Sequence, residues 1–132
     1  MKYMDKVRCD HIGLNGPGLW NILHGVAVRA TTPHGKLFFL SFLDIFKDMI
    51  KCKHCSEDLS LFIRSHNLSD YQNIIIDGID IGYFKWTCEL HNHVNTKLNK
   101  PFVSLTEAYK YYTTRHFDCK SCINLDTPAQ SS

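Results

Sequence analysis

Apolar side chains recur along the chain at intervals that suit α-helices. Between residues 19 and 30, the apolar positions Trp20, Leu23, Ala27 and Ala30 lie three or four residues apart. This spacing predicts a helix with one buried face, because residues three and four apart project from the same side of a helix.

A second helix is expected over residues 34–50. Thr32 can cap it, and Pro33 suits its first turn, where a missing N–H costs no hydrogen bond. Its apolar stripe is wide enough to face the interior of a helix bundle. The stripe comprises Leu37, Phe38, Phe42, Ile45, Phe46 and Met49.

Three more helical segments follow. A short third helix is expected to begin near Cys55, with Leu59, Phe62 and Ile63 as its apolar positions. The last helix is expected to run through Tyr112, after a capping box at residues 104–107. The fourth helix, over residues 81–98, has two adjoining stripes: Trp86, Leu90 and Val94 on one, and Cys88, His91 and Asn95 on the other.

The β-branched residues between positions 71 and 82, Ile74, Ile75, Ile76 and Ile79, are compatible with a strand. We interpret this segment as a buried connector, because one isolated strand would have no partner in the rest of the pattern. The predicted fold is therefore all-α, a four-helix bundle with a short fifth helix. We expect an N-terminal extension over residues 1–15, one domain over 16–116, and a flexible tail over 117–132.

Composition narrows the function only slightly. The chain has 132 residues, 44% of them hydrophobic, which is enough for one compact domain. Its net charge of +2 gives no basic field that would favour nucleic acid or an anionic membrane as partner. The N-terminus has no apolar stretch of signal-peptide length, and no apolar run approaches the length of a transmembrane helix. We therefore expect no signal peptide and no membrane partner.

The six cysteines include two Cys-x-x-Cys pairs, Cys52 with Cys55 and Cys119 with Cys122. Such pairs either undergo disulfide chemistry or bind zinc. The first pair is predicted at the start of a helix, where the helix dipole favours a thiolate. The alternative function is a zinc-binding interaction module with all four thiolates as ligands. A thioredoxin-like reductase is disfavoured, because it would require strands that alternate with helices.

Three motifs occur in order along the chain: Gly16-Pro17-Gly18-Leu19-Trp20 continuing to His24, then residues 52–55, then residues 91–101 with the sequence HNHVNTKLNKP. In this order they resemble the Erv/ALR family of FAD-dependent sulfhydryl oxidases, most closely the compact forms encoded by large DNA viruses. The resemblance implies a helical bundle that holds FAD without a dinucleotide-binding glycine motif.

The resemblance also implies roles for individual residues. Cys52 and Cys55 would be the catalytic disulfide, with Cys55 in contact with the flavin. Cys119 and Cys122 would be a shuttle that receives electrons from the substrate. The implied cofactor-binding residues are Gly16, Trp20, His24, Cys55, Cys88, His91, Asn92, Val94, Asn95, Lys97, Lys100 and Tyr109, with no metal ligand. Without the motifs, Trp20 and His24 would be interpreted as residues of the hydrophobic core.

The implied reaction forms a disulfide in a protein dithiol substrate, for example a thioredoxin-like carrier, and passes the electrons to molecular oxygen, giving hydrogen peroxide. A homodimer is expected, as is a location in the host cytoplasm or the virion if the chain is viral, made late in infection. The chain lacks the second cysteine that many relatives pair with the equivalent of Cys88. Cys88 is then either free or bridged elsewhere, with Cys9 as the remaining candidate.

Overall fold

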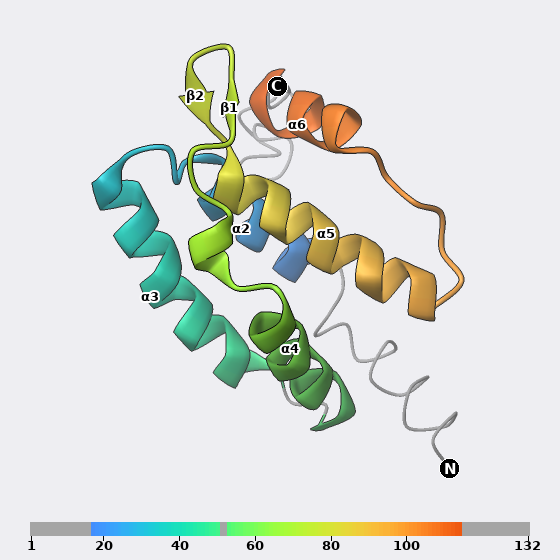
Figure 1. The fold of residues 1–132 in the computed structure, drawn as a ribbon. Coiled ribbons are helices and arrows are strands. Elements are labelled where there is room, and N and C mark those ends of the chain that lie inside the picture. The colour runs from blue at the N-terminus through green and yellow to red at the C-terminus, as the bar shows by residue number, and fades with distance from the viewer. Residues whose placement is uncertain (1–16, 51–52, 115–132) are drawn as a thin grey trace, which may run out of the picture.

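The computed structural model describes residues 17–50 and 53–114. Five helices account for most of them: α2 (Pro17–Val28), α3 (Pro33–Met49), α4 (Lys53–Ser65), α5 (Gly82–Lys97) and α6 (Leu105–Thr114). A single 3₁₀ turn (Leu68–Asp70) and two short strands, β1 (Ile75–Ile76) and β2 (Ile79–Asp80), connect α4 to α5. The all-α prediction is confirmed: α2 packs against α3, α5 and α6, while α3 also packs against α4 (Figure 1).

The helix ends follow the local signals in the sequence. Thr32 caps α3, since its hydroxyl accepts a hydrogen bond from the Gly35 amide at 3.1 Å, and Ser104 caps α6 by accepting from the Glu107 amide at 3.1 Å. Just beyond the end of α5, Asn99 has a φ of 58°, in the left-handed region. The Lys100 amide then donates back to the Asn95 carbonyl at 2.8 Å, which completes a Schellman motif.

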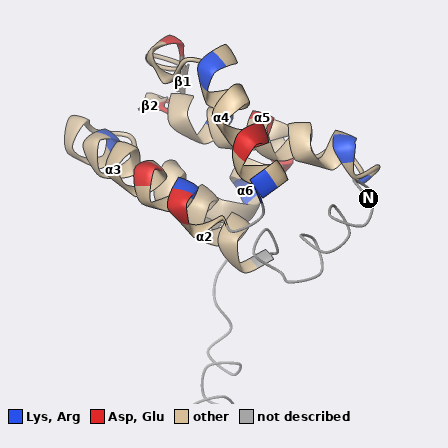
Figure 2. Cartoon of the chain, turned by 90° about the horizontal axis from the view of Figure 1, so that it is seen from below, with Lys and Arg blue, Asp and Glu red and all other residues tan. Residues whose placement is uncertain are grey.

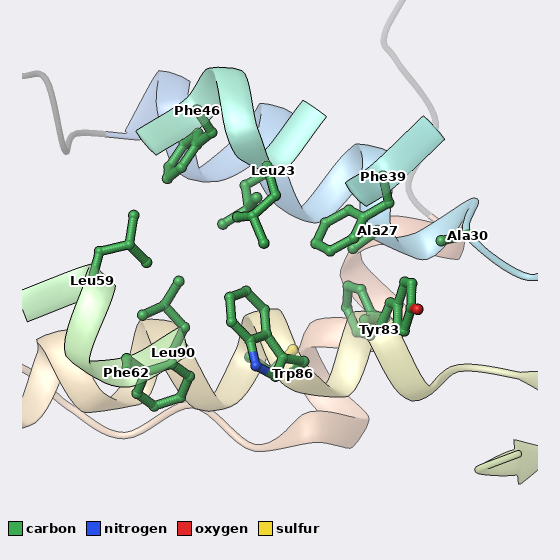
Figure 3. Close-up of a cluster of buried hydrophobic side chains, with 13 residues drawn as sticks. Leu23, Ala27, Ala30, Phe39, Phe46, Leu59, Phe62, Tyr83, Trp86 and Leu90 are labelled. Atoms are coloured by element: carbon green, nitrogen blue, oxygen red, sulfur yellow. The ribbon is translucent and has the colours of Figure 1, made fainter. Parts of the chain in front are cut away.

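The hydrophobic core lies between α2 and α3 on one side and α4 and α5 on the other (Figure 3). Trp86 is fully buried and points from α5 toward the side chains of α2 and α3. The rings of Phe39 and Phe62 meet it edge-on, and its indole N–H donates to the His66 carbonyl at 2.7 Å. The predicted inward stripes of α2 and α5 are confirmed, because Leu23, Ala27, Trp86 and Leu90 are all buried.

The predicted stripe of α3 is wrong in part. Leu37, Phe38 and Ile45 are 66%, 59% and 60% exposed, and Met49 is exposed as well. Phe46 is buried as predicted, but the other buried residues of α3 are Phe39 and Leu43. Apolar residues surround much of this helix, so their pattern alone did not determine which side meets the core.

The interpretation of residues 71–82 as a buried connector is also wrong. β1 and β2 form an antiparallel hairpin, in which Ile75 pairs with Asp80 and Ile76 with Ile79. Their turn is Asp77-Gly78, and both residues have positive φ (52° and 79°), as a two-residue hairpin turn requires. The strand thus finds its partner locally, and the isoleucine side chains of the hairpin are exposed.

Asp80 joins this hairpin to the helices. Its carboxylate accepts hydrogen bonds from the Lys36 ammonium at 2.5 Å and from the amides of Asn73 and Gly82 at 2.9 Å each. Burial alone would raise the Asp80 pKa, but these donors outweigh it and lower the pKa to about 2. Asp80 therefore connects α3, the hairpin and the first residue of α5.

Charged side chains of both signs are interspersed along the helices (Figure 2). This distribution agrees with the small net charge of the whole chain. No helix within residues 17–50 and 53–114 is both long and apolar enough to cross a membrane.

Candidate functional site

Cys55 is the third residue of α4, so it lies in the first turn of that helix, as the sequence predicts. The backbone N–H groups of this turn point toward the helix start, and the helix dipole favours negative charge there. Cys55 is partly exposed. Its sulfur is therefore placed where a thiolate is stabilised and can be reached by another group.

The Cys55 thiol lines a small pocket of about 60 Å³, which we call the thiol pocket. Trp20 of α2, Phe46 of α3 and Leu90 of α5 contribute apolar walls, so the helices that form the core also build this pocket. Val94, one of the predicted cofactor-binding residues, lines it as well.

A second, larger pocket of about 340 Å³ lies between α2, α5 and α6, and we call it the histidine pocket. His24, Cys88, His91 and Asn92, all predicted site residues, line it together with Tyr112. The structure thus brings His24 of α2 together with Cys88, His91 and Asn92 of α5, which are far from it in sequence.

The stacked rings of Trp20 and His91 connect the two pockets. Their centroids are 3.9 Å apart and their planes differ by 8°. Trp20 lines the thiol pocket and His91 lines the histidine pocket, so this pair lies between the two. His24 stacks less closely on both rings, and the ring of Tyr112 lies 5.1 Å from that of His24.

The two histidines form one hydrogen-bonded chain. His24 Nδ1 lies 2.8 Å from the Thr87 hydroxyl, and His24 Nε2 lies 3.0 Å from His91 Nδ1. Burial, reinforced by the neighbouring His91, lowers the pKa of His24 to about 3. Burial and then the positive charge of Lys100 lower the pKa of His91 to about 4. Both rings are consequently neutral at pH 7.

Asn92 and Asn95 lie in α5 next to the histidine pocket. The Asn92 amide donates to the Val103 carbonyl at 2.7 Å and accepts from the Val103 amide at 2.9 Å. Asn95 is buried and its amide reaches the Asn92 oxygen at 3.4 Å. Asn92 therefore fixes the segment that leads from α5 to α6, and with it the wall that α6 contributes.

Lys97 and Lys100 differ in their surroundings. The Lys97 ammonium lies 2.6 Å from the Asp58 carboxylate of α4, and His93 lies 3.7 Å from the same carboxylate. All three side chains line the thiol pocket. Asp58 follows Cys55 by three residues in α4. Lys100 is exposed and influences the site through its charge on His91.

Cys88 is a buried, free thiol within the histidine pocket. The bridge from Cys88 to Cys9 that the sequence left open involves Cys9, which lies outside the described residues. Burial raises the pKa of the Cys88 thiol to about 12, although a hydrogen bond with Thr87 opposes this effect. Cys88 is thus a neutral wall of the pocket at pH 7 rather than a reactive thiolate.

Tyr109, the predicted cofactor-binding residue of α6, packs edge-on against Phe84 at 5.7 Å. The α6 side chains that line the histidine pocket are instead Glu107, Ala108, Tyr111 and Tyr112. The Tyr112 hydroxyl also donates to the Asn21 side chain at 2.7 Å, which fastens α6 to α2.

Several predicted site residues lie outside the described residues, namely Gly16, Cys52, Cys119 and Cys122. This also applies to three of the four cysteines of the zinc alternative. Among residues 17–50 and 53–114, no group of three or more histidine, cysteine or acidic side chains is arranged to hold a metal ion.

Sequence reasoning missed Thr87 and Asp58. Thr87 lies four residues before His91, on the same face of α5, which was the available signal. Asp58 likewise follows Cys55 by one helical turn. Nothing in the sequence indicated that Lys97 would meet Asp58, because the two are brought together only by the packing of α4 against α5.

Comparisons with known proteins identify the family of this chain. The family model described as Erv1 / Alr matches residues 17–113. The mitochondrial FAD-linked sulfhydryl oxidases ERV1 of Saccharomyces cerevisiae and erv1 of Schizosaccharomyces pombe are 33% and 32% identical to this chain over 89 residues, each covering 65% of it. The match spans only 43% and 46% of those proteins, less than half their length.

A Frog virus 3 protein, 088R, named as a putative FAD-linked sulfhydryl oxidase, is 30% identical over 105 residues. That match covers 74% of this chain and 65% of the viral protein. The family match includes α2 to α6, and hence both pockets and the stacked Trp20–His91 pair. The chain therefore belongs to the Erv1/Alr family.

Proposed function

We propose that this chain is an FAD-dependent sulfhydryl oxidase that forms disulfide bonds in protein dithiols and reduces molecular oxygen to hydrogen peroxide. One observation carries the proposal: the Cys55 thiol, in the first turn of α4, lines a pocket whose Trp20 wall stacks on His91. Membership of the Erv1/Alr family supports it, as do relatives named as FAD-linked sulfhydryl oxidases.

The residues present fit FAD. The histidine pocket, at about 340 Å³, lies within the usual range of about 300 to 1,000 Å³ for small-ligand sites. The Trp20, His24, His91 and Tyr112 rings offer flat apolar faces to flat heterocycles. The candidate cofactor-binding residues are those named from the sequence, with Tyr112 preferred to Tyr109 as the aromatic wall.

The proposed chemistry uses a disulfide between Cys52 and Cys55. A substrate thiolate attacks the Cys52 sulfur, and the bond between Cys52 and Cys55 breaks, which leaves Cys55 as a thiolate. A second substrate thiol then displaces Cys52, so that the substrate gains one disulfide and loses two electrons and two protons. FAD, when bound, accepts these two electrons and transfers them to oxygen. The start of α4 stabilises the Cys55 thiolate during this exchange.

The tail pair Cys119 and Cys122 is proposed to deliver the electrons from a protein substrate to Cys52. Such a shuttle suits a large substrate, because a folded protein cannot insert its own dithiol into a pocket as small as the thiol pocket, about 60 Å³. The substrate would be a protein dithiol, for instance a thioredoxin-like carrier.

Oxygen consumption by the full chain tests the proposal. With dithiothreitol as substrate, the purified chain should contain FAD, consume oxygen and produce an equal amount of hydrogen peroxide. Cys55→Ser should keep its FAD but consume no oxygen. Cys9→Ser, the same exchange at a cysteine outside both Cys-x-x-Cys pairs, is the matched control. Undiminished turnover by Cys55→Ser, or a colourless wild-type protein that carries zinc, would refute the proposal.

A homodimer is also proposed. The exposed apolar side chains of α3, Leu37, Phe38 and Ile45, support it together with the exposed Ile22 of α2, since such a surface is stabilised by covering it. Light scattering should give twice the chain mass for the wild type and the chain mass for Phe38→Glu. Identical masses for the two proteins would contradict this interface.

A viral origin is the last part of the proposal, with synthesis late in infection and a location in the host cytoplasm or the virion. The support is a viral relative, because the Frog virus 3 protein is 30% identical to this chain over 105 residues. Mass spectrometry of purified virions and of infected-cell cytoplasm should detect the chain in at least one of them. Its absence from both would contradict this location.

A further inference from the structure

The hydrogen-bonded chain that runs from Phe84 through Thr87 and His24 to His91 has only one consistent arrangement of protons. The Thr87 hydroxyl lies 2.7 Å from the Phe84 carbonyl and 2.8 Å from His24 Nδ1. A carbonyl oxygen can only accept, so the single hydroxyl proton of Thr87 is donated to Phe84. The neighbouring Cys88 thiol is neutral at pH 7 and can donate its own S–H to the Thr87 oxygen, so it does not take this proton. His24 Nδ1 must then carry a proton and donate it to the Thr87 oxygen.

The position of this first proton determines the remaining protons on His24 and His91. His24 is neutral at pH 7, so a protonated Nδ1 leaves Nε2 with a lone pair. His91 Nδ1, 3.0 Å away, must therefore donate to His24 Nε2. Because His91 is also neutral, its own Nε2 has no proton. The Lys100 charge next to His91 opposes a second proton on the ring.

The Nε2 atom of His91 is available to a ligand. Among the described residues it makes no protein hydrogen bond, and no buried side-chain nitrogen or oxygen there lacks a partner, so this atom is accessible rather than enclosed. His91 lines the histidine pocket, and its ring is held in place by the stack with Trp20.

We propose that Thr87 is a positioning residue: acting through His24, it fixes His91 in the tautomer whose Nε2 is a bare hydrogen-bond acceptor for the ligand of the histidine pocket. The matching ligand group is an N–H or O–H donor, such as the adenine amino group, the flavin imide or a ribityl hydroxyl. A phosphate oxygen does not match, because it is itself only an acceptor. This inference rests on the proposed function, since it takes FAD as the ligand.

Removal of the Thr87 hydroxyl should reverse the direction of the hydrogen bond between His24 and His91. In Thr87→Val, the buried His24 Nδ1–H would have no acceptor, which is costly. The His24 proton then moves to Nε2 and is donated to His91 Nδ1, so His91 carries its own proton on Nε2. That atom becomes a donor and faces another donor on FAD. Thr87→Ser keeps a hydroxyl in the same place and should preserve the wild-type arrangement.

The test is ¹⁵N NMR of the histidine rings in the full-length chain, combined with FAD binding. Wild type and Thr87→Ser should show protons on Nδ1 of both His24 and His91, and similar FAD affinities. Thr87→Val should show both rings switched to Nε2–H and FAD binding weakened about tenfold, as expected for one lost hydrogen bond. Val is matched in shape to Thr, so a simple loss of packing would not switch two ring tautomers together.

Three results would overturn the inference: a proton on His91 Nε2 in the wild type, unchanged tautomers in Thr87→Val, or a Thr87→Ser protein that behaves like Thr87→Val. If Thr87→Val does not fold, the histidine tautomers of the wild type and of Thr87→Ser still test the inferred proton arrangement. Failure of the proposed function is distinguishable, because a wild-type chain that binds no FAD would still reveal its histidine tautomers.

Discussion

Replacement of Asp80 by asparagine should weaken the fold in a manner that depends on pH. The Asp80 side chain is only 11% exposed and pairs with Lys36, which is 17% exposed. Two backbone amides, those of Asn73 and Gly82, also donate to the carboxylate. The asparagine side chain would keep the shape and one acceptor oxygen, but it would leave the Lys36 ammonium without its counterion.

The pKa shift of Asp80 gives the magnitude of the stability that its carboxylate contributes. The Asp80 pKa falls from 3.8 to about 2 on folding, and this difference corresponds to about 2 kcal/mol of stability at pH 7. A lowered pKa means that the contribution is complete well above pH 4 and is lost as the pH falls from about 4 toward 2. At pH 3 the unfolded chain is mostly protonated and the folded chain mostly ionised, so about 1 kcal/mol remains.

Urea denaturation followed by tryptophan fluorescence at pH 7 and pH 3 measures this effect. Asp77→Asn is the matched control, because it removes the same charge from the hairpin turn, and asparagine tolerates the positive φ of 52° found there. We expect Asp80→Asn to lose about 2 kcal/mol at pH 7 and about half as much at pH 3. A loss equal to that of Asp77→Asn, or one that does not shrink at pH 3, would refute the reasoning.

Three further predictions concern the scaffold, a pocket cysteine and the tail. Gly82→Ala should destabilise the fold by about 3 kcal/mol or more in urea denaturation, because its Cβ would lie 1.7 Å from the Tyr71 carbonyl oxygen. Gly25→Ala, whose Cβ would have nothing within 4 Å, should not destabilise it. Equal stabilities of the two variants would contradict this prediction. Cys88 should react with iodoacetamide about a thousandfold more slowly in the folded than in the unfolded chain, since its pKa is about 12 rather than 9. Mass spectrometry measures the two rates, and equal rates would show an accessible thiolate. Cys119→Ser should leave turnover of dithiothreitol intact but slow oxidation of a protein dithiol, and wild-type rates with both substrates would exclude the shuttle.

Local signals were sufficient to predict most of the fold. The caps at Thr32 and Ser104 and the inward stripes of α2 and α5 depend on residues close in sequence, and the structure contains all of them. The two errors have different causes. The buried side of α3 is set by the long-range partners α2 and α4. The hairpin is local, and its Asp77-Gly78 turn, which joins β1 to β2, is a signal that the sequence itself contains.

The sequence provides candidate site residues but not their geometry. The motifs identified Trp20, His24 and His91, which lie together. Their hydrogen bonds were not predictable, since His24 and Thr87 are 63 positions apart and meet only when α2 packs on α5. Lys97 was expected among the cofactor-binding residues. Its ammonium lies 2.6 Å from the Asp58 carboxylate, a contact that a sequence pattern cannot indicate.

Anaerobic reduction of the bound flavin by dithiothreitol tests the central claim most directly, because it isolates electron transfer from Cys55 without oxygen. The absorbance of oxidised flavin in the purified full-length chain should disappear in the wild type and in Cys9→Ser, and should persist in Cys55→Ser at the same FAD content. A Cys55→Ser protein whose flavin is bleached as fast as that of the wild type would contradict the account.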